Sequence, residues 1–310
     1  MGKRLNSFWN HFVVKNAKFG TIGILVALAL VTPFVCSATP QSEVIETIEP
    51  HGRINWSRWM IYAVEITGPV SENREESKGE TSVETDPLLF SDLFSTMKSV
   101  RIDSSTRLSD LIKQRSMIYS QLWGMIRSAE VVKREYLSNG AVELTLAFDM
   151  KGGFSQLALP AEIQPVPHIR TLKEPTHENQ SRNGRSGSGT ERDIAEIYTG
   201  LVLDARGLSA KPCMAPKIIS ESGQEVYGPA YVSREFAVQK GMAYYTCDLD
   251  AGKESARLGD RPVLVRALRT GGANRSDFVI SNADAANIQG ASRHLEFLKE
   301  CKVAIVIDSW

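Results

Sequence analysis

Asp204 and Arg206 are the residues whose types and placement best suit a binding site. They follow the apolar run 201–203 and flank the turn at Gly207, so a strand should carry both side chains to its carboxyl end. Sheets of mixed type often present ligands at that edge. The alternative is structural, because residues two apart on a strand share a face and can pair or cap a turn. Asp308, at the end of the last apolar run, could join them.

The histidines that could act as catalytic bases are poorly placed. His168 and His177 border a segment without apolar residues, and His51 lies in a stretch that we expect to be unstructured. His294 falls on an expected helix, where a solvated face is the default for histidine. A Ser/His/Asp or Cys/His site is therefore poorly supported.

Two short motifs match catalytic patterns by spacing alone. Ser95-Thr96-Met97-Lys98 has the SxxK spacing of serine-acylating enzymes, but the SDN and KTG elements that accompany it are absent. The glycine-rich run 184–189 lacks the preceding strand and the following Lys-Ser/Thr of a phosphate loop, and it has the composition of a flexible spacer. We predict no catalytic residues, no cofactor and no enzymatic activity.

The cysteines predict no metal site. Cys213, Cys247 and Cys301 are widely spaced, with no CxxC pair and no nearby histidine at ligand spacing. At most one disulfide can form among them. The favoured alternative is three buried thiols that behave as small apolar residues.

The N-terminus is typical of an export signal. The first acidic residue is Glu43, and a basic segment is followed by an apolar run from Phe19 to Val31. A small residue, Ala38, then marks the expected cleavage point of a signal peptide at residues 1–38. We therefore expect an exported protein of a bacterial envelope, in the periplasm or associated with the membrane.

Other interpretations of this segment remain open. The uncharged stretch 19–42 is also long enough to span a bilayer, which takes about 20 residues, so a retained anchor is the main alternative and a buried helix a third. Val35 stands where a lipoprotein signal would have a small residue, which disfavours lipidation of Cys36.

Composition restricts the class of partner. The 310 residues include 36 basic and 36 acidic side chains, so the net charge is zero. That balance removes the long-range attraction that drives non-specific nucleic-acid binding, and we expect no nucleic-acid partner. Membrane contact is expected only through an uncleaved N-terminal segment. The oligomeric state does not follow from composition.

Polar segments divide the exported part. Residues 71–86 are predicted to form a solvated loop, and residues 174–192 contain no apolar residue and resemble a flexible linker. The chain length favours two folded units. We predict α+β domains at 52–160 and 195–310, joined by a linker at 161–194, each with helices packed on a mainly antiparallel or mixed sheet.

The first domain should combine strands with one long helix. Met60, Tyr62, Val64 and Ile66 alternate along one face of a strand. Apolar residues recur at helical spacing over 108–129, with Arg115 on the same stripe as a snorkelling side chain. Asn139-Gly140 predicts a hairpin between strands 131–137 and 141–150.

The second domain should be richer in strands. A capping box at 281–284 predicts a helix whose apolar stripe continues through Ile288, Ala291, Leu295 and Leu298. The final run 303–307 is apolar enough for a central strand. The other expected strands are 197–205, 217–219, 226–227, 242–247, 263–268 and 278–280.

Three segments of the second domain resemble a known family. They are residues 198–219 (YTGLVLDARGLSAKPCMAPKII), 223–243 (GQEVYGPAYVSREFAVQKGMA) and 276–288 (SDFVISNADAANI). Together they resemble the C-terminal region of bacterial envelope proteins of the LPP20 lipoprotein and flagellar assembly protein T group. The helix and Asn-Gly hairpin before the linker are similar to that group's N-terminal α/β module.

The resemblance implies a role in assembly at the cell envelope. Its motifs contain no catalytic residue. The resemblance therefore implies protein–protein contacts with other envelope or flagellar basal-body proteins. The alternative function is a periplasmic small-ligand binding or carrier domain, with a polar site near Asp204 and Arg206.

Overall fold

The computed structural model describes residues 42–67, 87–163, 198–290 and 292–309. The expected export segment, the loop at 71–86 and the linker at 174–192 lie outside these residues. Within them the chain forms three β-sheets and eight helices, and the predicted α+β fold class is confirmed. None of the helices described there has both the length and the apolar character needed to cross a bilayer.

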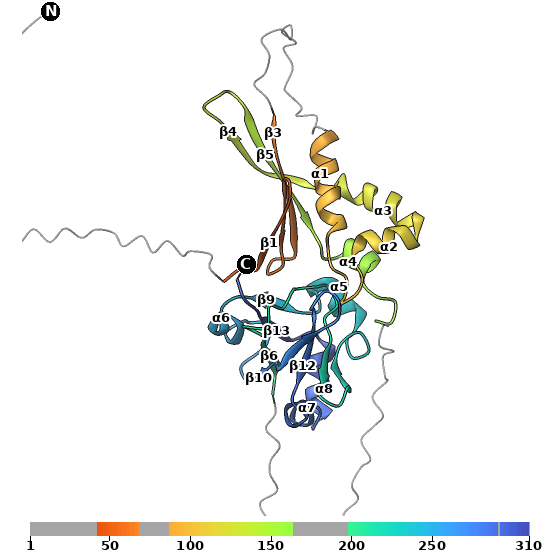
Figure 1. Ribbon diagram of the computed structural model, residues 1–310, viewed down its shortest axis with the longest axis vertical. Helices are drawn as coiled ribbons and strands as arrows, with labels where there is room; N and C mark the ends of the chain where they lie inside the picture. The colour runs from red at the N-terminus through yellow and green to blue at the C-terminus, as the bar shows by residue number, and fades with distance from the viewer. Residues whose placement is uncertain (1–41, 68–86, 164–197, 291, 310) are drawn as a thin grey trace, which may run out of the picture. The chain divides into compact units, whose positions relative to one another are not determined.

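The first sheet has five antiparallel strands in the order β1-β2-β3-β5-β4 (Figure 1). Strands β1 and β2 lie before or at the expected domain start and were not predicted, because the stretch around His51 was expected to be unstructured. The strands are β1 (Ile45–Ile48), β2 (Gly52–Asn55), β3 (Met60–Thr67), β4 (Glu130–Tyr136) and β5 (Val142–Asp149).

The predicted hairpin between β4 and β5 is confirmed. Gly140 has a φ of 80°, which only glycine adopts without strain, and the Asn139 side chain accepts a hydrogen bond from the backbone N–H of Ala141 at 3.0 Å. The backbone N–H of Leu137 donates to the carbonyl of Ala141 at 2.8 Å and closes the turn.

We expected the face of β3 that carries Met60, Tyr62, Val64 and Ile66 to be buried, and this expectation is wrong. Ile61 and Ala63 are fully buried, whereas Met60, Tyr62 and Val64 are only partly buried. Ile66 is 59% exposed. Helix α1 (Pro87–Lys98) packs on β3 and β2 and covers the sheet there (Figure 1). Alternation fixes which residues share a face, but the covering helix decides which face is buried.

The predicted long helix at 108–129 is two helices. Helix α2 (Leu108–Gln114) and helix α3 (Ser116–Ile126) are separated by Arg115, whose φ of −134° and ψ of 90° are not helical. Arg115 is therefore an exposed junction and not a snorkelling member of one stripe. A short helix, α4 (Gly153–Ala158), follows β5.

The second half contains two four-stranded sheets. The first is entirely parallel, in the order β10-β6-β13-β9, and its strands are β6 (Gly200–Asp204), β9 (Tyr244–Thr246), β10 (Pro262–Arg266) and β13 (Val303–Val306). The second is mixed, in the order β11-β12-β7-β8, with β7 (Ile218–Ser220), β8 (Glu225–Tyr227), β11 (Arg269–Gly271) and β12 (Asp277–Ile280).

Most elements predicted in the second half are present. Every expected strand overlaps a strand of the structure. Strand β13 is an interior strand of its sheet and is fully buried, as predicted. Of the strands described in this half, β11 alone was not predicted. Of the predicted capping box, the N-cap bond is present, since Ser281 Oγ accepts from the Asp284 backbone N–H at 3.0 Å. The expected continuous stripe is instead two helices, and Leu295 is 41% exposed.

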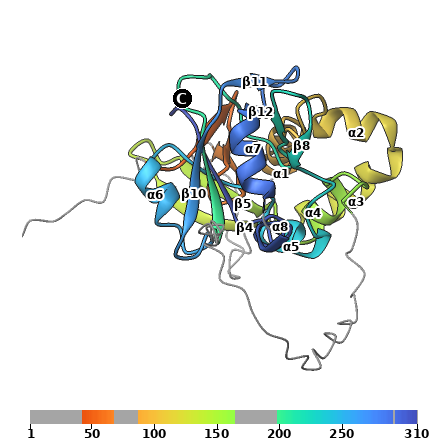
Figure 2. The ribbon, with the colours of Figure 1, turned by 90° about the horizontal axis from the view of Figure 1, so that it is seen from below.

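Four helices belong to this half. Helix α6 (Leu249–Lys253) packs on β9 and β13, and helix α7 (Asn282–Gln289) packs on β7 and β8 (Figure 2). Helix α8 (Ser292–Lys299) contacts β6, and helix α5 (Arg234–Lys240) contacts α4 of the first half.

Buried polar contacts join the two halves of the described chain. Arg101 is 1% exposed, donates to both carboxylate oxygens of Glu46 at 2.7 and 2.6 Å, and donates through Nε to the carbonyl of Pro212 at 2.7 Å. Trp59 Nε1 donates to the carbonyl of Ala243 at 3.1 Å. The described residues accordingly belong to one compact unit, and one apolar cluster includes core residues of both halves.

Candidate functional site

The carboxyl edge of the parallel sheet carries the predicted polar cluster. Asp204 ends β6 and Arg266 ends β10, the strand beside it, while Asp308 follows β13 on the other side. Parallel pairing brings these strand ends to one edge because every strand runs in the same direction. The sheet can do so because β6 and β13 are almost wholly apolar and buried.

Asp204 and Arg206 pair with each other. Arg206 Nε donates to Asp204 Oδ1 at 2.8 Å, and Arg206 Nη2 donates to Oδ2 at 2.8 Å, which is a bidentate arrangement. The hydrogen bond from Arg206 lowers the pKa of the Asp204 carboxyl. Asp204 and Arg206 therefore bind each other, which is the structural alternative to a ligand-binding role that we predicted from the sequence.

Asp308 joins this cluster, as the sequence allowed. Its carboxylate accepts from the backbone N–H of Gly207 at 2.8 and 3.1 Å, and Gly207 has a φ of 81°. The carboxylate thereby holds the turn that follows β6. Asp204, Arg206 and Asp308 are thus all used in fixing the loop at the sheet edge.

A small cavity lies beside this edge. It has a volume of about 230 Å³ and is lined by Ser209, Ala210, Lys211, Asp308 and Ser309. That volume is below the range of about 300–1,000 Å³ typical of drug-sized ligand pockets. A small polar molecule is the largest guest that the cavity suits.

The described histidines do not contribute to this edge. His51 lies in the turn between β1 and β2 and contacts Asp92 Oδ2 through Nδ1 at 3.0 Å, so the expectation of an unstructured stretch is wrong. His294 is 2% exposed, which overturns its predicted solvated position. Its Nε2 accepts from the Tyr198 backbone N–H at 3.1 Å and its Nδ1 lies 3.2 Å from the Ile288 carbonyl. His168 and His177 lie outside the described residues.

Other candidates for chemistry are also in structural use. Ser95 lies on an exposed position of α1, and Lys98 Nζ lies 5.4 Å from the centre of the Phe94 ring. Cys213, Cys247 and Cys301 are free thiols, the first and last of them buried. No group of three His, Cys, Asp or Glu side chains able to hold a metal occurs among the residues with described positions.

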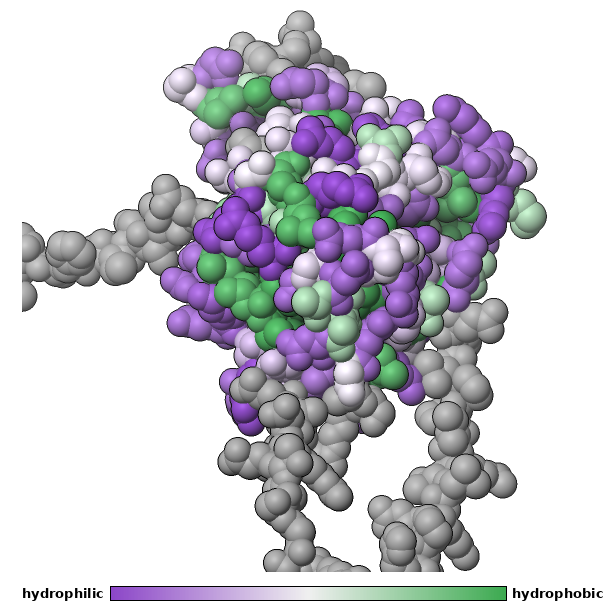
Figure 3. Space-filling view, turned by 60° about the horizontal axis from the view of Figure 1, so that its bottom comes forward, coloured by the Kyte–Doolittle hydropathy of each residue, from purple (hydrophilic) through white to green (hydrophobic). Residues whose placement is uncertain are grey.

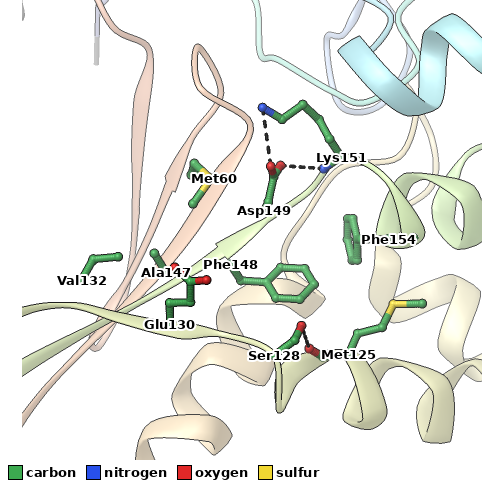
Figure 4. Close-up of a pocket in the computed structure, with 11 residues that line it drawn as sticks. Met60, Met125, Ser128, Glu130, Val132, Ala147, Phe148, Asp149, Lys151 and Phe154 are labelled. Carbon is green, nitrogen blue, oxygen red and sulfur yellow. Dashed lines mark hydrogen bonds and ion pairs between the residues drawn. The ribbon is translucent and has the colours of Figure 1, made fainter.

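A larger pocket, which the sequence did not indicate, opens at the edge of the first sheet (Figure 4). Its volume is about 470 Å³, and its walls come from β3, β4, β5, the end of α3 and the start of α4. Met60, Met125, Phe148 and Phe154 supply apolar surface. Asp149 is paired with Lys151 at 3.6 Å on one side. No local motif marks this pocket, because three separate stretches of the chain build it: Met60, residues 125–132 and residues 147–154.

The rim of this pocket continues into an exposed edge strand. All seven residues of β4 are exposed, and β4 is the last strand of its sheet. Val131, Val132 and Tyr136 are 40%, 53% and 77% exposed. On the face of the molecule seen in Figure 3, hydrophobic residues form several separate patches among hydrophilic ones. The sequence predicted β4 as a strand but could not identify it as an edge.

Comparison with known proteins concerns the second half. No curated protein matches the chain. Residues 200–309 match a family model described as the second domain of Treponema pallidum Tp0624. The matched range begins at the first residue of β6 and ends just after β13, and it covers about a third of the chain. The part of this protein that carries Asp204, Arg206 and Asp308 is therefore similar to that domain.

Proposed function

We propose that this chain is a non-enzymatic, exported protein of the bacterial envelope whose folded part acts through contacts with other proteins. The observation that carries the proposal is strand β4, which exposes three large apolar side chains at an edge where no other described strand pairs with it. Such edges recruit extended segments of other chains.

The chemistry of the polar residues supports the non-enzymatic part of the proposal. At the carboxyl edge of the parallel sheet, the carboxylates of Asp204 and Asp308 accept hydrogen bonds from neighbouring protein groups. A catalytic group must instead direct its reactive atom toward a substrate position.

Export and the class of partner rest on the sequence. The basic, apolar and small-residue order of the first 38 residues supports export, and the resemblance to the LPP20 and flagellar assembly protein T group supports an assembly role. The proposed partners are other envelope or flagellar basal-body proteins.

Site-specific photocrosslinking in the native cell tests the interaction. A photoreactive amino acid at Tyr136, which is 77% exposed, should form an adduct with another protein. The same amino acid at Met117, which is 75% exposed on α3, is the matched control and should give far less. Equal labelling at both positions, or no adduct at Tyr136, would contradict the proposal.

Cell fractionation followed by N-terminal sequencing tests export. A mature chain that begins at Thr39 in the periplasmic fraction is the expected result, and an intact N-terminus in the membrane fraction would indicate a retained anchor. Recovery in the cytoplasm would overturn this part of the proposal.

A second candidate function is small-ligand binding at the edge formed by Asp204 and Arg206. The cavity of about 230 Å³ beside Asp308 favours it. Thermal-shift measurements with sugars and amino acids should then raise the melting temperature of the natural chain but not of the Asp204→Ala/Arg206→Ala variant. Equal shifts in both proteins would exclude this site.

A further inference from the structure

The available edge of β4 is five residues long. A register shift between Val131 and Lys133 interrupts the pairing of β4 with β5, and the hairpin turn begins at Leu137. The segment from Val132 to Tyr136 therefore lies between a bulge and a turn, with every residue exposed. An added strand can therefore pair with these five residues of β4.

The hydrogen-bonding pattern determines which residues face outward. The Leu137 N–H bonds to the Ala141 carbonyl, so this opposed pair is hydrogen-bonded. Hydrogen-bonded and non-hydrogen-bonded pairs alternate along antiparallel strands. Lys133 and Glu135 therefore direct their backbone groups toward β5, while Arg134 and Tyr136 direct theirs away from it. A new strand must bond to Arg134 and Tyr136.

The side chains of β4 suit an antiparallel copy of the same strand. If Arg134 faces Arg134 of a second copy, Lys133 faces Glu135 twice and Val132 faces Tyr136 twice. Lys133 and Glu135 already lie on one side of the strand, with their Nζ and Oε1 atoms 2.8 Å apart. Two copies would thus form an alternating group of two lysines and two glutamates.

The neighbouring registers are less favourable. The two adjacent registers that satisfy the outward hydrogen bonds place either Lys133 or Glu135 opposite itself and create no Lys133–Glu135 pair. Opposite charges on facing strands stabilise and like charges destabilise, by about 0.2–1 kcal/mol for each pair. The arrangement with Arg134 opposite itself has one like-charged pair and two opposite ones, so charge favours it.

The pocket at the sheet edge adds a place for an aromatic ring. Val132 lines the 470 Å³ pocket together with Met60, Met125 and Phe154. Figure 4 shows Val132 among the residues that line this pocket. In the favoured register Tyr136 of the second copy lies opposite Val132. Tyr136 is the most exposed of the large apolar side chains described.

We propose that two copies of this chain associate through antiparallel pairing of β4, with Arg134 at the two-fold axis. The two five-stranded sheets then form one continuous sheet across the interface. The lysine–glutamate group selects the register, and Tyr136 of each copy covers the pocket of the other. This inference deepens the proposed function, on which it rests, by naming a second copy as one protein partner.

Disulfide trapping of the full chain tests the register. Single substitutions Lys133→Cys, Arg134→Cys and Glu135→Cys are oxidised at low protein concentration, and the natural chain gives the baseline for its own cysteines. Cα atoms of hydrogen-bonded antiparallel pairs lie about 5.5 Å apart, within disulfide range. Arg134→Cys should therefore form dimers most, and mixed Lys133→Cys and Glu135→Cys should form dimers more than either alone. Met117→Cys is the exposed control.

Charge exchange tests the same interface without cysteines. Glu135→Lys places lysines opposite lysines and should raise the dimer dissociation constant about tenfold, as the two altered pairs imply. The exchanged variant Lys133→Glu/Glu135→Lys restores opposite charges and should return the constant to within about threefold of the natural value. Sedimentation equilibrium measures both, and circular dichroism checks that each variant is folded.

The outcomes separate this inference from the proposed function. A chain that stays monomeric at all concentrations, or dimers trapped equally at Met117→Cys, would overturn self-pairing. If Tyr136 still crosslinks to a different protein in the cell, the proposed function survives that result. Loss of both the dimer and the cellular adduct would remove both.

Discussion

At the scale of single residues, burial decides what a charge contributes. Arg101 and Glu46 form a pair with side-chain exposures of 2% and 11%, whereas Arg58 pairs with Glu43 at the surface, where its own side chain is 61% exposed. A desolvated charge that loses its partner is costly, and an exposed one is solvated by water. The two pairs are therefore a natural comparison within one chain.

We expect Glu46→Ala to lower the free energy of unfolding by about 3–5 kcal/mol, since it removes the carboxylate that binds the buried Arg101 guanidinium. Arg58→Ala, the surface control, should cost less than about 1 kcal/mol. Urea denaturation measures both. The Glu46→Leu/Arg101→Met double variant should be less destabilised than Glu46→Ala. If the double variant is as unstable as Glu46→Ala, the buried charge of Arg101 is not the cause of the lost stability.

Thiol reactivity is also set by burial. Burial raises the pKa of Cys213 to about 12 and that of Cys301 to about 11, and it raises the pKa of the partly buried Cys247. In the native chain iodoacetamide should label Cys247 and leave the other two unlabelled until urea unfolds the protein, as measured by peptide mass spectrometry. Rapid native labelling of Cys213 would contradict the packing.

The same pKa shifts predict how the stability of the folded state changes with pH. Thiols with raised pKa values bind protons more tightly in the folded state than in the unfolded state. Their contribution is complete below the unfolded value of about 9 and is lost as pH rises toward 11–12. Cys213 and Cys301 therefore contribute to alkaline denaturation.

At the scale of elements, two glycines should respond to alanine with opposite sign. Gly140 has a positive φ in the β4–β5 turn, and Gly124 lies within α3 with open space around its Cβ position. Gly140→Ala should destabilise by about 1 kcal/mol through backbone strain. Gly124→Ala should stabilise by about 0.5–1 kcal/mol because alanine favours helix. Thermal melts by circular dichroism measure both, and equal signs would contradict the assigned conformations.

Element prediction succeeded where the signal was local. The Asn139-Gly140 turn and the Ser281 N-cap depend on backbone groups within a few residues, and both are present. The break at Arg115 was missed because apolar spacing continues through it, so periodicity cannot separate two short helices from one long helix.

At the scale of the whole molecule, we expect the described part to unfold as one unit. Trp59 packs against Gly241, where an added Cβ would meet the indole ring, and Arg101 bonds to the carbonyl of Pro212. In a Trp9→Phe/Trp310→Phe variant, tryptophan fluorescence reports Trp56, Trp59 and Trp123 of the first half. It should therefore change at the same urea concentration as amide-exchange protection in residues 200–309. Separate transitions would indicate two independent domains. Gly241→Ala should lower both midpoints together.

The candidate site shows the same division between local and long-range information. Strand β6, its polar end and the possible approach of Asp308 could be predicted, because an apolar run followed by charges and glycine specifies a strand end. Pairing of Asp204 with Arg206 was one of the predicted alternatives, but its bidentate geometry depends on side-chain direction. The 470 Å³ pocket could not be predicted, since three separate stretches of the chain build it.

The sequence by itself determined the fold class, most strands and the local turns, because each rests on the periodicity and backbone preferences of neighbouring residues. Tertiary structure alone decided which face of β3 is buried, that His294 is enclosed, that Arg101 reaches Glu46 and Pro212, and that β4 is left at an exposed edge. Burial and pairing are properties of residues brought together from distant parts of the chain. Their partners are therefore absent from any local pattern.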